Sequence, residues 1–116
     1  MNQCFEQQRV SAAHIMVVGC GALGNEVLKN LVLLGVEHIV VVDFDIVEMG
    51  NLSRSILFLP SDAEQKRQKV EVVAERLKTI NPSVEVKAII GDVAYDVGLG
   101  LLCQQDVVIG CVDNRW

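Results

Sequence analysis

The chain has 116 residues, of which 51% are hydrophobic, and its 15 acidic and 10 basic side chains leave a formal net charge of −5. This length predicts a single domain, and the acidic balance argues against a nucleic-acid or anionic-membrane surface, which would need clustered bases. No apolar run approaches the roughly 18 residues that indicate a membrane span, and the amino-terminal residues do not resemble a secretory signal. The high apolar content leads us to expect apolar surface that a second subunit or further chain covers.

Four cysteines, Cys4, Cys20, Cys103 and Cys111, are scattered along the chain and never form a Cys-x-x-Cys pair. This spacing indicates neither a disulfide framework nor a zinc site. A reducing compartment fits such cysteines best, so we expect a cytoplasmic protein.

The first third of the chain predicts a short polar helix over residues 3–13, a strand over 15–18, a helix after a glycine-rich turn, and a second strand over 39–42. The first strand is apolar throughout, as is typical of a central parallel strand. The second helix has helical apolar periodicity and ends at Gly35, where a left-handed cap is expected. Its buried side is expected to hold Leu23, Val27, Leu28, Leu31 and Val32, and its polar side Asn25, Glu26, Lys29 and Asn30.

The remaining elements are an ordered, packed loop over residues 44–62, a helix over 65–80 that Asn81-Pro82 ends, a strand over 84–90, a weak helix over 95–103 and a strand over 107–109. This order predicts an α/β fold: a Rossmann-like, mostly parallel sheet with helices on both faces. Sheets of this class commonly have six strands, so we expect residues 1–116 to be one nucleotide-binding domain, incomplete, from a longer protein.

A Gly-x-Gly-x-x-Gly turn, Gly19 to Gly24, joins the first strand to the following helix. In such a turn the first glycine permits the tight bend, the second lets a ligand approach the backbone, and the third lets the helix pack on the strand. The helix amino terminus offers N–H groups to phosphate or ribose oxygens. A purely structural turn is the alternative, but an acid at the end of the second strand, Asp43, favours a nucleotide site.

Two acids and two bases follow at positions that suit a nucleotide. The Asp43 carboxylate can accept both ribose hydroxyls, although an ordinary strand-end acid is the alternative. Asp45 could orient the loop, lie near a metal, or be a solvated loop acid. Arg54 and Lys69 can supply the cations that a triphosphate needs, although each taken alone is more often a surface base. An NAD-dependent oxidoreductase shares the glycine turn and the acid, but the sequence shows no sign of a nicotinamide pocket.

Four motifs occur together in this chain: the glycine turn, Asp-Phe-Asp-x-Val-Glu-x-x-Asn-Leu-x-Arg over residues 43–54, a lysine opening a helix that ends in Ile-Asn-Pro at 80–82, and Cys-x-Asp-Asn at 111–114. Together they resemble the ubiquitin-activating-enzyme superfamily. The resemblance is strongest to its bacterial ThiF/HesA/MoeB-type adenylyltransferases, which activate sulfur-carrier proteins in molybdopterin and thiamine biosynthesis. It extends roughly from Glu6 to Asn114.

In that family ATP adenylates the C-terminal glycine carboxylate of a ubiquitin-fold or sulfur-carrier protein and releases pyrophosphate. The resemblance therefore implies ATP and Mg²⁺ as cofactors, such a carrier as partner, and a homodimer or pseudo-symmetric pair. The nucleotide-binding residues that it implies are Gly19, Gly21, Ala22, Gly24, Asp43, Asp45, Asn51, Arg54 and Lys69. It implies Arg54, Lys69 and Asp113 as catalytic residues, with Asp113 also a Mg²⁺ ligand. They would act by neutralising charge and positioning two anions, not as an acid–base pair.

The chain also departs from the family pattern. Ser55 stands where the family often has glutamine, and Lys66 is a rival to Lys69. An amino-terminal arginine segment and the half that docks the carrier are expected to be missing, so the 116-residue chain is expected to be inactive alone.

Three further features have alternative interpretations. A non-catalytic subunit of a paired adenylyltransferase is an alternative function. Cys20 and Cys111 could act as nucleophiles, but small buried cysteines are the favoured explanation. His14 and His38 are expected to be structural.

Overall fold

The structure is a computed structural model that describes residues 9–48, 57–92 and 97–111. Residues 9–12 are helical, in agreement with the described part of the predicted first helix. The other elements are β1 (His14–Val18), α2 (Ala22–Leu34), β2 (His38–Asp43), α3 (Pro60–Glu64), α4 (Lys69–Ile80), β3 (Glu85–Ile90), α6 (Leu99–Cys103) and β4 (Val107–Gly110).

These strands form one sheet in the order β3-β2-β1-β4, and each neighbouring pair is parallel. His14 of β1 is in register with His38 of β2, which is in register with Glu85 of β3. The chain moves outward from β1 through β2 to β3, then returns to the other side of β1 as β4. This is the order of the first half of a doubly wound nucleotide-binding sheet, so the predicted α/β class is confirmed.

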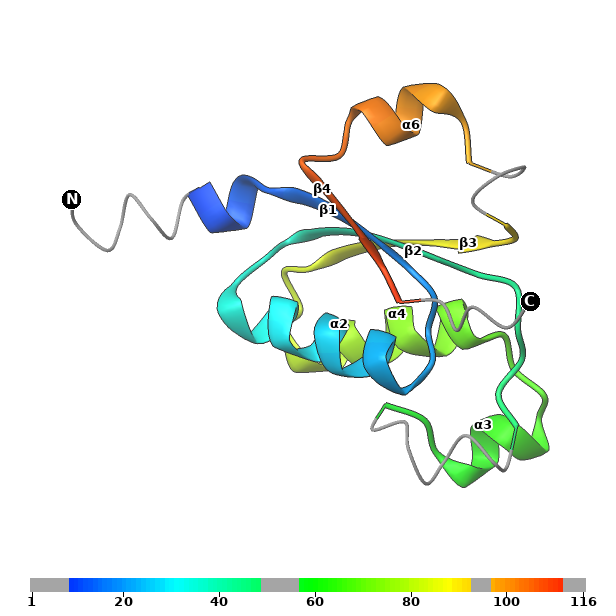
Figure 1. Cartoon of the computed structure of the whole chain (residues 1–116). Helices are drawn as coiled ribbons and strands as arrows, with labels where there is room; N and C mark the ends of the chain where they lie inside the picture. The colour runs from blue at the N-terminus through cyan, green and yellow to red at the C-terminus, as the bar shows by residue number, and fades with distance from the viewer. Residues whose placement is uncertain (1–8, 49–56, 93–96, 112–116) are drawn as a thin grey trace.

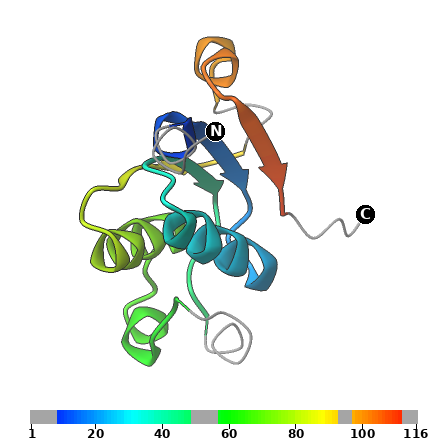
Figure 2. The ribbon, with the colours of Figure 1, turned by 90° about the vertical axis from the view of Figure 1, so that its left-hand side faces the viewer.

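Helices cover both faces of the sheet, with α2 and α4 on one face and α6 on the other (Figure 1). Figure 2 shows the sheet from the side, between α6 on one face and α2 and α4 on the other. Alternate residues of β1 point to opposite faces: Val17 packs in one apolar cluster with Leu28 and Leu77, whereas Met16 packs in the other with Leu101. The central strands are therefore buried on both sides, which explains their continuous apolar sequences.

Helix α2 ends as predicted but presents a different face. Gly35 has φ 103°, and its N–H donates to the carbonyl of Val32, which confirms the left-handed cap. The assignment of Leu23 to the buried side is wrong, since 61% of it is exposed. The assignment of Asn25 to the polar side is also wrong, because this residue is fully buried.

Helix α4 begins at Lys69, so the predicted start at residue 65 is wrong by four residues. The short helix α3 precedes it, and Lys66 has φ 51°, which separates the two helices. Gln68 is extended and forms an antiparallel bridge with Ile46. Apolar periodicity could not locate this boundary, because the bridge to a segment far back in the sequence holds the chain out of the helix. The predicted end at Asn81 is confirmed.

The predicted helix over 95–103 is described from residue 97, and its helical part begins at Leu99. Among the described residues, no helix has both the length and the apolar character needed to cross a membrane.

Candidate functional site

The glycine turn lies at the carboxyl end of β1, next to the point where the strand order reverses between β1 and β4. Gly19 has φ 102°, a conformation that favours glycine, and its N–H donates to the carbonyl of Val42 at 2.8 Å. A Cβ added at Gly24 would lie 2.1 Å from the Gly19 carbonyl oxygen, whereas a Cβ at Gly21 would meet no described atom within 4 Å. Gly19 and Gly24 therefore pack directly against each other, whereas Gly21 faces open space.

Asp43 ties this turn to the end of β2. One carboxylate oxygen accepts the Cys20 N–H at 2.7 Å, and the other accepts the Asp45 N–H at 2.8 Å. The Asp43 carbonyl accepts the N–H of Gly91, which follows β3, at 3.1 Å. A carboxylate has about four lone-pair sites, so each Asp43 oxygen keeps capacity for another donor such as a ribose hydroxyl.

Lys69 is a buried cation at the same edge of the sheet. Only 7% of the residue is exposed, and its Nζ lies 3.8 Å from Oδ2 of Asp45. The Lys69 N–H also donates to the Asp45 carbonyl at 3.0 Å, so the first residue of α4 is held against the segment that follows β2. Lys66 is exposed in the turn between α3 and α4. Of the two rival lysines, it is Lys69 that contacts Asp45.

Cys20 is buried within the turn, and nearby charges shift the pKa of its thiol. Burial raises the pKa of its thiol well above the usual range, and the negative charge of Asp43 raises it further. The positive charge of Lys69 lowers this pKa, but the effect of burial is larger. Burial also raises the pKa of Cys111, the residue after β4. Both thiols stay protonated at neutral pH, which favours a packing role over a nucleophilic one.

The structure thus brings together seven of the predicted site residues at one edge of the sheet: Gly19, Gly21, Ala22, Gly24, Asp43, Asp45 and Lys69. Asn51, Arg54 and Asp113 lie outside the described residues.

Magnesium is commonly bound through one or two carboxylates together with substrate phosphates. The Asp45 side chain, 55% exposed beside Lys69, fits such a role. Within the described ranges, no group of three or more His, Cys, Asp or Glu side chains could hold a metal by itself.

Asn25 is a residue of the site that sequence reasoning missed. Its side-chain Nδ2 donates to the carbonyls of Cys20 at 2.8 Å and Gly21 at 2.9 Å, and its Oδ1 accepts the N–H of Leu57 at 3.1 Å. Helical periodicity placed this residue among polar neighbours on the outer side. The available signal was its position in the first turn of the helix, where an asparagine side chain can turn back to nearby backbone groups.

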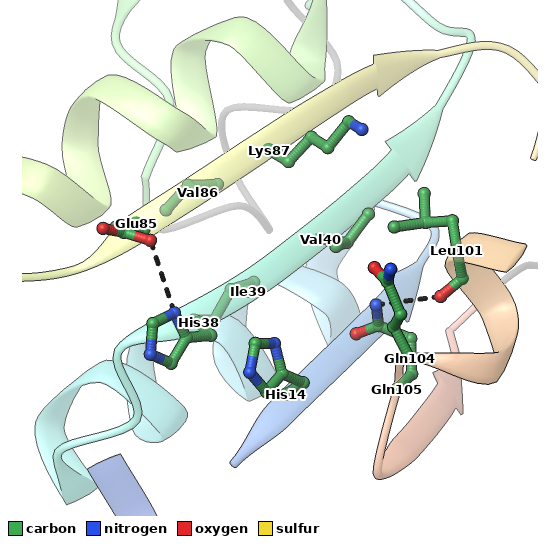
Figure 3. Close-up of a pocket in the computed structure, with 10 residues that line it drawn as sticks. All are labelled: His14, His38, Ile39, Val40, Glu85, Val86, Lys87, Leu101, Gln104 and Gln105. Atoms are coloured by element: carbon green, nitrogen blue, oxygen red, sulfur yellow. Dashed lines mark hydrogen bonds and ion pairs between the residues drawn. The ribbon is translucent and has the colours of Figure 1, made fainter. Parts of the chain in front are cut away.

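A pocket of about 250 Å³ lies at the opposite end of the strands, between the sheet and α6 (Figure 3). The first residues of three strands, His14, His38 and Glu85, line it together with Gln104 and Gln105 after α6. The two imidazole rings stack with centroids 4.5 Å apart, and Nδ1 of His38 lies 3.4 Å from a carboxylate oxygen of Glu85. Ligands of open α/β sheets bind outside the carboxyl ends of the strands, so this pocket is separate from the glycine turn.

Comparison with known proteins identifies one family. The ThiF family model matches residues 3–116. The mouse (Mus musculus) adenylyltransferase and sulfurtransferase MOCS3 is 38% identical over 108 residues, which cover 93% of this chain and 23% of that protein. The sulfur carrier protein adenylyltransferase of Thermus thermophilus is 37% identical over 108 residues, which cover 93% of this chain and 39% of that protein.

A solved structure shares the fold. The crystal structure of the Escherichia coli tRNA N6-threonylcarbamoyladenosine dehydratase TcdA in complex with AMP matches with a TM-score of 0.81 at 29% identity. The match covers 93% of this chain and 44% of that one. The chain therefore spans less than half the length of each of these three proteins.

Proposed function

The chain belongs to the ThiF family, and on that premise we propose that it is the ATP-binding part of an adenylyltransferase. The substrate of the whole protein is the C-terminal glycine carboxylate of a ubiquitin-fold or sulfur-carrier protein, which ATP converts to an acyl-adenylate with release of pyrophosphate. Residues 1–116 form one nucleotide-binding domain of that protein. Support comes from relatives that are named adenylyltransferases and from a related structure that contains AMP.

The observation that carries the proposal is the position of Lys69. Its buried ammonium lies 3.8 Å from the carboxylate of Asp45, which is mostly exposed. The N–H of Asp45 donates to the carboxylate of Asp43, which also accepts the Cys20 N–H of the glycine turn. An ammonium is a compact point charge that suits phosphate oxygens. A glycine turn alone would serve any nucleotide, whereas a buried cation beside it favours a nucleotide whose phosphates carry the chemistry.

The nucleotide roles follow from this arrangement. The backbone of Gly19, Gly21, Ala22 and Gly24 lines the nucleotide, and the open space at Gly21 lets it approach. The free oxygen capacity of Asp43 serves the ribose hydroxyls. Asp45 pairs with Lys69, and its exposed carboxylate would be available to a magnesium ion bound with the phosphates. By the family resemblance, Asn51 and Arg54 contact the phosphates and Asp113 binds Mg²⁺.

The chemical step joins two anions, so the site must neutralise charge. A carboxylate oxygen of the carrier attacks the α-phosphorus of ATP, the bond to the bridging oxygen breaks, and pyrophosphate leaves with the electron pair. No proton needs to move, so no general acid or base is required. Lys69 and Arg54 stabilise the charge that builds on the phosphates, and they hold the two reactants in line. Magnesium, when bound, supplies further positive charge.

The assembly and location of the whole protein are part of the same proposal. A homodimer or pseudo-symmetric pair brings two such domains together, and the cysteine pattern is consistent with action in the cytoplasm. The partner is a protein, so the acidic domain has no need of a nucleic-acid surface.

The direct test is ATP–pyrophosphate exchange by the full-length protein with a cognate ubiquitin-fold partner. We expect exchange that depends on the partner, and its loss in Lys69→Ala. Lys66→Ala is the matched control, because this lysine lies three residues away and is exposed. Calorimetric titration of the chain with Mg·ATP and with NAD distinguishes the proposed adenylyltransferase from the alternative, an NAD-dependent oxidoreductase. Tight NAD binding without any response to Mg·ATP would favour an oxidoreductase domain and contradict the proposal.

A further inference from the structure

We propose that Asn25 is a positioning residue of the nucleotide site, whose buried amide turns the carbonyls of the glycine turn inward and its N–H groups outward toward the phosphates. The inference rests on the proposed function, because it assumes that the turn binds ATP.

The side-chain amide of Asn25 makes three hydrogen bonds, all of them to backbone groups. Both of its donor hydrogens are used, on the carbonyls of Cys20 and Gly21, and its oxygen accepts the N–H of Leu57. The residue has no exposed surface, so it cannot itself touch a nucleotide. Any influence on the ligand must pass through the backbone that it holds.

Peptide geometry determines what this contact does. In a trans peptide the C=O and the following N–H point in opposite directions, and the described residues contain no cis peptide bond. A Cys20 carbonyl held toward Asn25 therefore aims the N–H of Gly21 away from it. The Gly21 carbonyl accepts both the backbone N–H of Asn25, at 2.9 Å, and its Nδ2, also at 2.9 Å, so backbone and side chain together aim the N–H of Ala22 away. These are among the first N–H groups of α2, which lack intrahelical acceptors and suit anionic oxygens.

The same amide joins two segments that are far apart in sequence. Leu57 is itself buried, and it lies three residues after Arg54 in the sequence. Asn25 thus links the glycine turn to the point where the described chain resumes after residues 49–56. Only an amide can make all three contacts, because a carboxylate cannot donate and a serine hydroxyl has a single hydrogen.

The first test is Asn25→Asp, with Asn30→Asp as the matched control, because Asn30 is an exposed asparagine of the same helix. Aspartate keeps the acceptor for Leu57 but places a negative charge against two carbonyl oxygens. A buried carboxyl in such surroundings has a raised pKa, and its protonated form regains one donor. We expect Asn25→Asp to weaken Mg·ATP binding about tenfold or more at pH 8, and to regain part of it near pH 5.5. Asn30→Asp should follow the wild-type pH profile.

The second test needs no variant. Amide resonances of the 116-residue chain, followed by ¹H–¹⁵N NMR during titration with Mg·ATP, should show downfield shifts for Gly21 and Ala22. Binding that shifts other residues of the site but leaves these two amides unchanged would overturn the inference, and so would an Asn25→Asp variant that binds like Asn30→Asp. Failure of the wild-type chain to bind Mg·ATP would contradict the proposed function, and with it this inference.

Discussion

The three glycines of the turn differ in their surroundings, and single substitutions can separate their effects on stability and on binding. Gly24 is packed against the Gly19 carbonyl, whereas Gly21 has an ordinary φ of −75° and open space at its Cβ position. We therefore expect stability to depend on Gly24 and the approach of a nucleotide to depend on Gly21. The motif already predicts a different role for each glycine.

We expect Gly24→Ala to lower the free energy of unfolding by about 3 kcal/mol, at the upper end of overpacking costs, because a backbone carbonyl cannot move aside easily. Gly21→Ala should cost about 1 kcal/mol or less but weaken Mg·ATP binding about tenfold. Urea denaturation and calorimetry measure the two effects. Equal loss of stability in both variants would contradict this division of roles.

The buried thiol of Cys20 makes stability depend on alkaline pH. Burial raises the pKa of this thiol in the folded chain, whereas in the unfolded chain it is about 8.5. Above that pH the unfolded chain loses a proton that the folded chain keeps, so the free energy of unfolding falls as pH rises. Below it, this contribution is fully present.

We therefore expect the free energy of unfolding to decrease between about pH 8.5 and pH 10, at no more than about 1.4 kcal/mol per pH unit for each such thiol. Cys20→Ala should reduce that slope. Cys103→Ala, which removes an exposed thiol, should leave it unchanged. Urea denaturation at a series of pH values gives the slopes, and equal slopes in the wild type and Cys20→Ala would refute the assignment.

Among the elements, the connection from α3 to α4 decides where Lys69 lies. Asp62, with 2% of its surface exposed, accepts the Leu59 N–H at 2.7 Å and pairs with Arg76 of α4 at 2.9 Å and 3.1 Å. It also pairs with Arg67, whose carbonyl accepts the N–H of Val47. One carboxylate therefore holds the turn that ends immediately before Lys69.

We expect Asp62→Ala to lower the free energy of unfolding by about 3 kcal/mol, since it removes one partner of a buried ion pair and leaves a backbone N–H unpaired. The partial exposure of both arginines keeps the loss at the lower end of the range for such pairs. Glu71→Ala, at an exposed position in the first turn of α4, is the control. Thermal and urea unfolding measure both, and a loss below about 1 kcal/mol would contradict the role given to Asp62.

At the scale of the whole molecule, the chain leaves apolar surface uncovered. Exposed large side chains include Leu33 and Leu34 at the end of α2, Leu99 of α6, and Val107 and Val108 of the edge strand β4. This agrees with the composition, which predicted apolar surface in need of a partner. The relatives are more than twice as long as the matched region, so their remaining chain is available to cover such a surface.

We expect the 116-residue chain to bind Mg·ATP but not to catalyse ATP–pyrophosphate exchange. Catalysis needs the carrier carboxylate to be positioned at the α-phosphate, and binding of one reactant alone does not supply that positioning. The measurement is ATP–pyrophosphate exchange by the chain, with and without the carrier. The full-length protein, assayed in the same way, is the comparison. Measurable pyrophosphate release from the chain alone would show it to be wrong.

Much of the fold followed from local patterns. Continuous apolar runs predicted the central strands, Gly35 the end of α2, and Asn81-Pro82 the end of α4, and each is confirmed. The misplaced start of α4 and the buried position of Asn25 have a common cause. Both depend on hydrogen bonds to distant segments, which apolar periodicity does not record. The Lys69 N–H donates to the Asp45 carbonyl beside the Ile46–Gln68 bridge, and Oδ1 of Asn25 accepts the Leu57 N–H.

The sequence by itself determined the class of the fold and predicted candidate site residues, although not Asn25, because strand patterns, glycine spacing and strand-end acids are local properties of the chain. Only the tertiary structure decided which of them meet. It placed Lys69 rather than Lys66 against Asp45, joined Asp43 to the glycine turn, and buried Asn25 beneath that turn. These contacts arise where parallel strands and their crossover helices come together, so they depend on packing across the sheet.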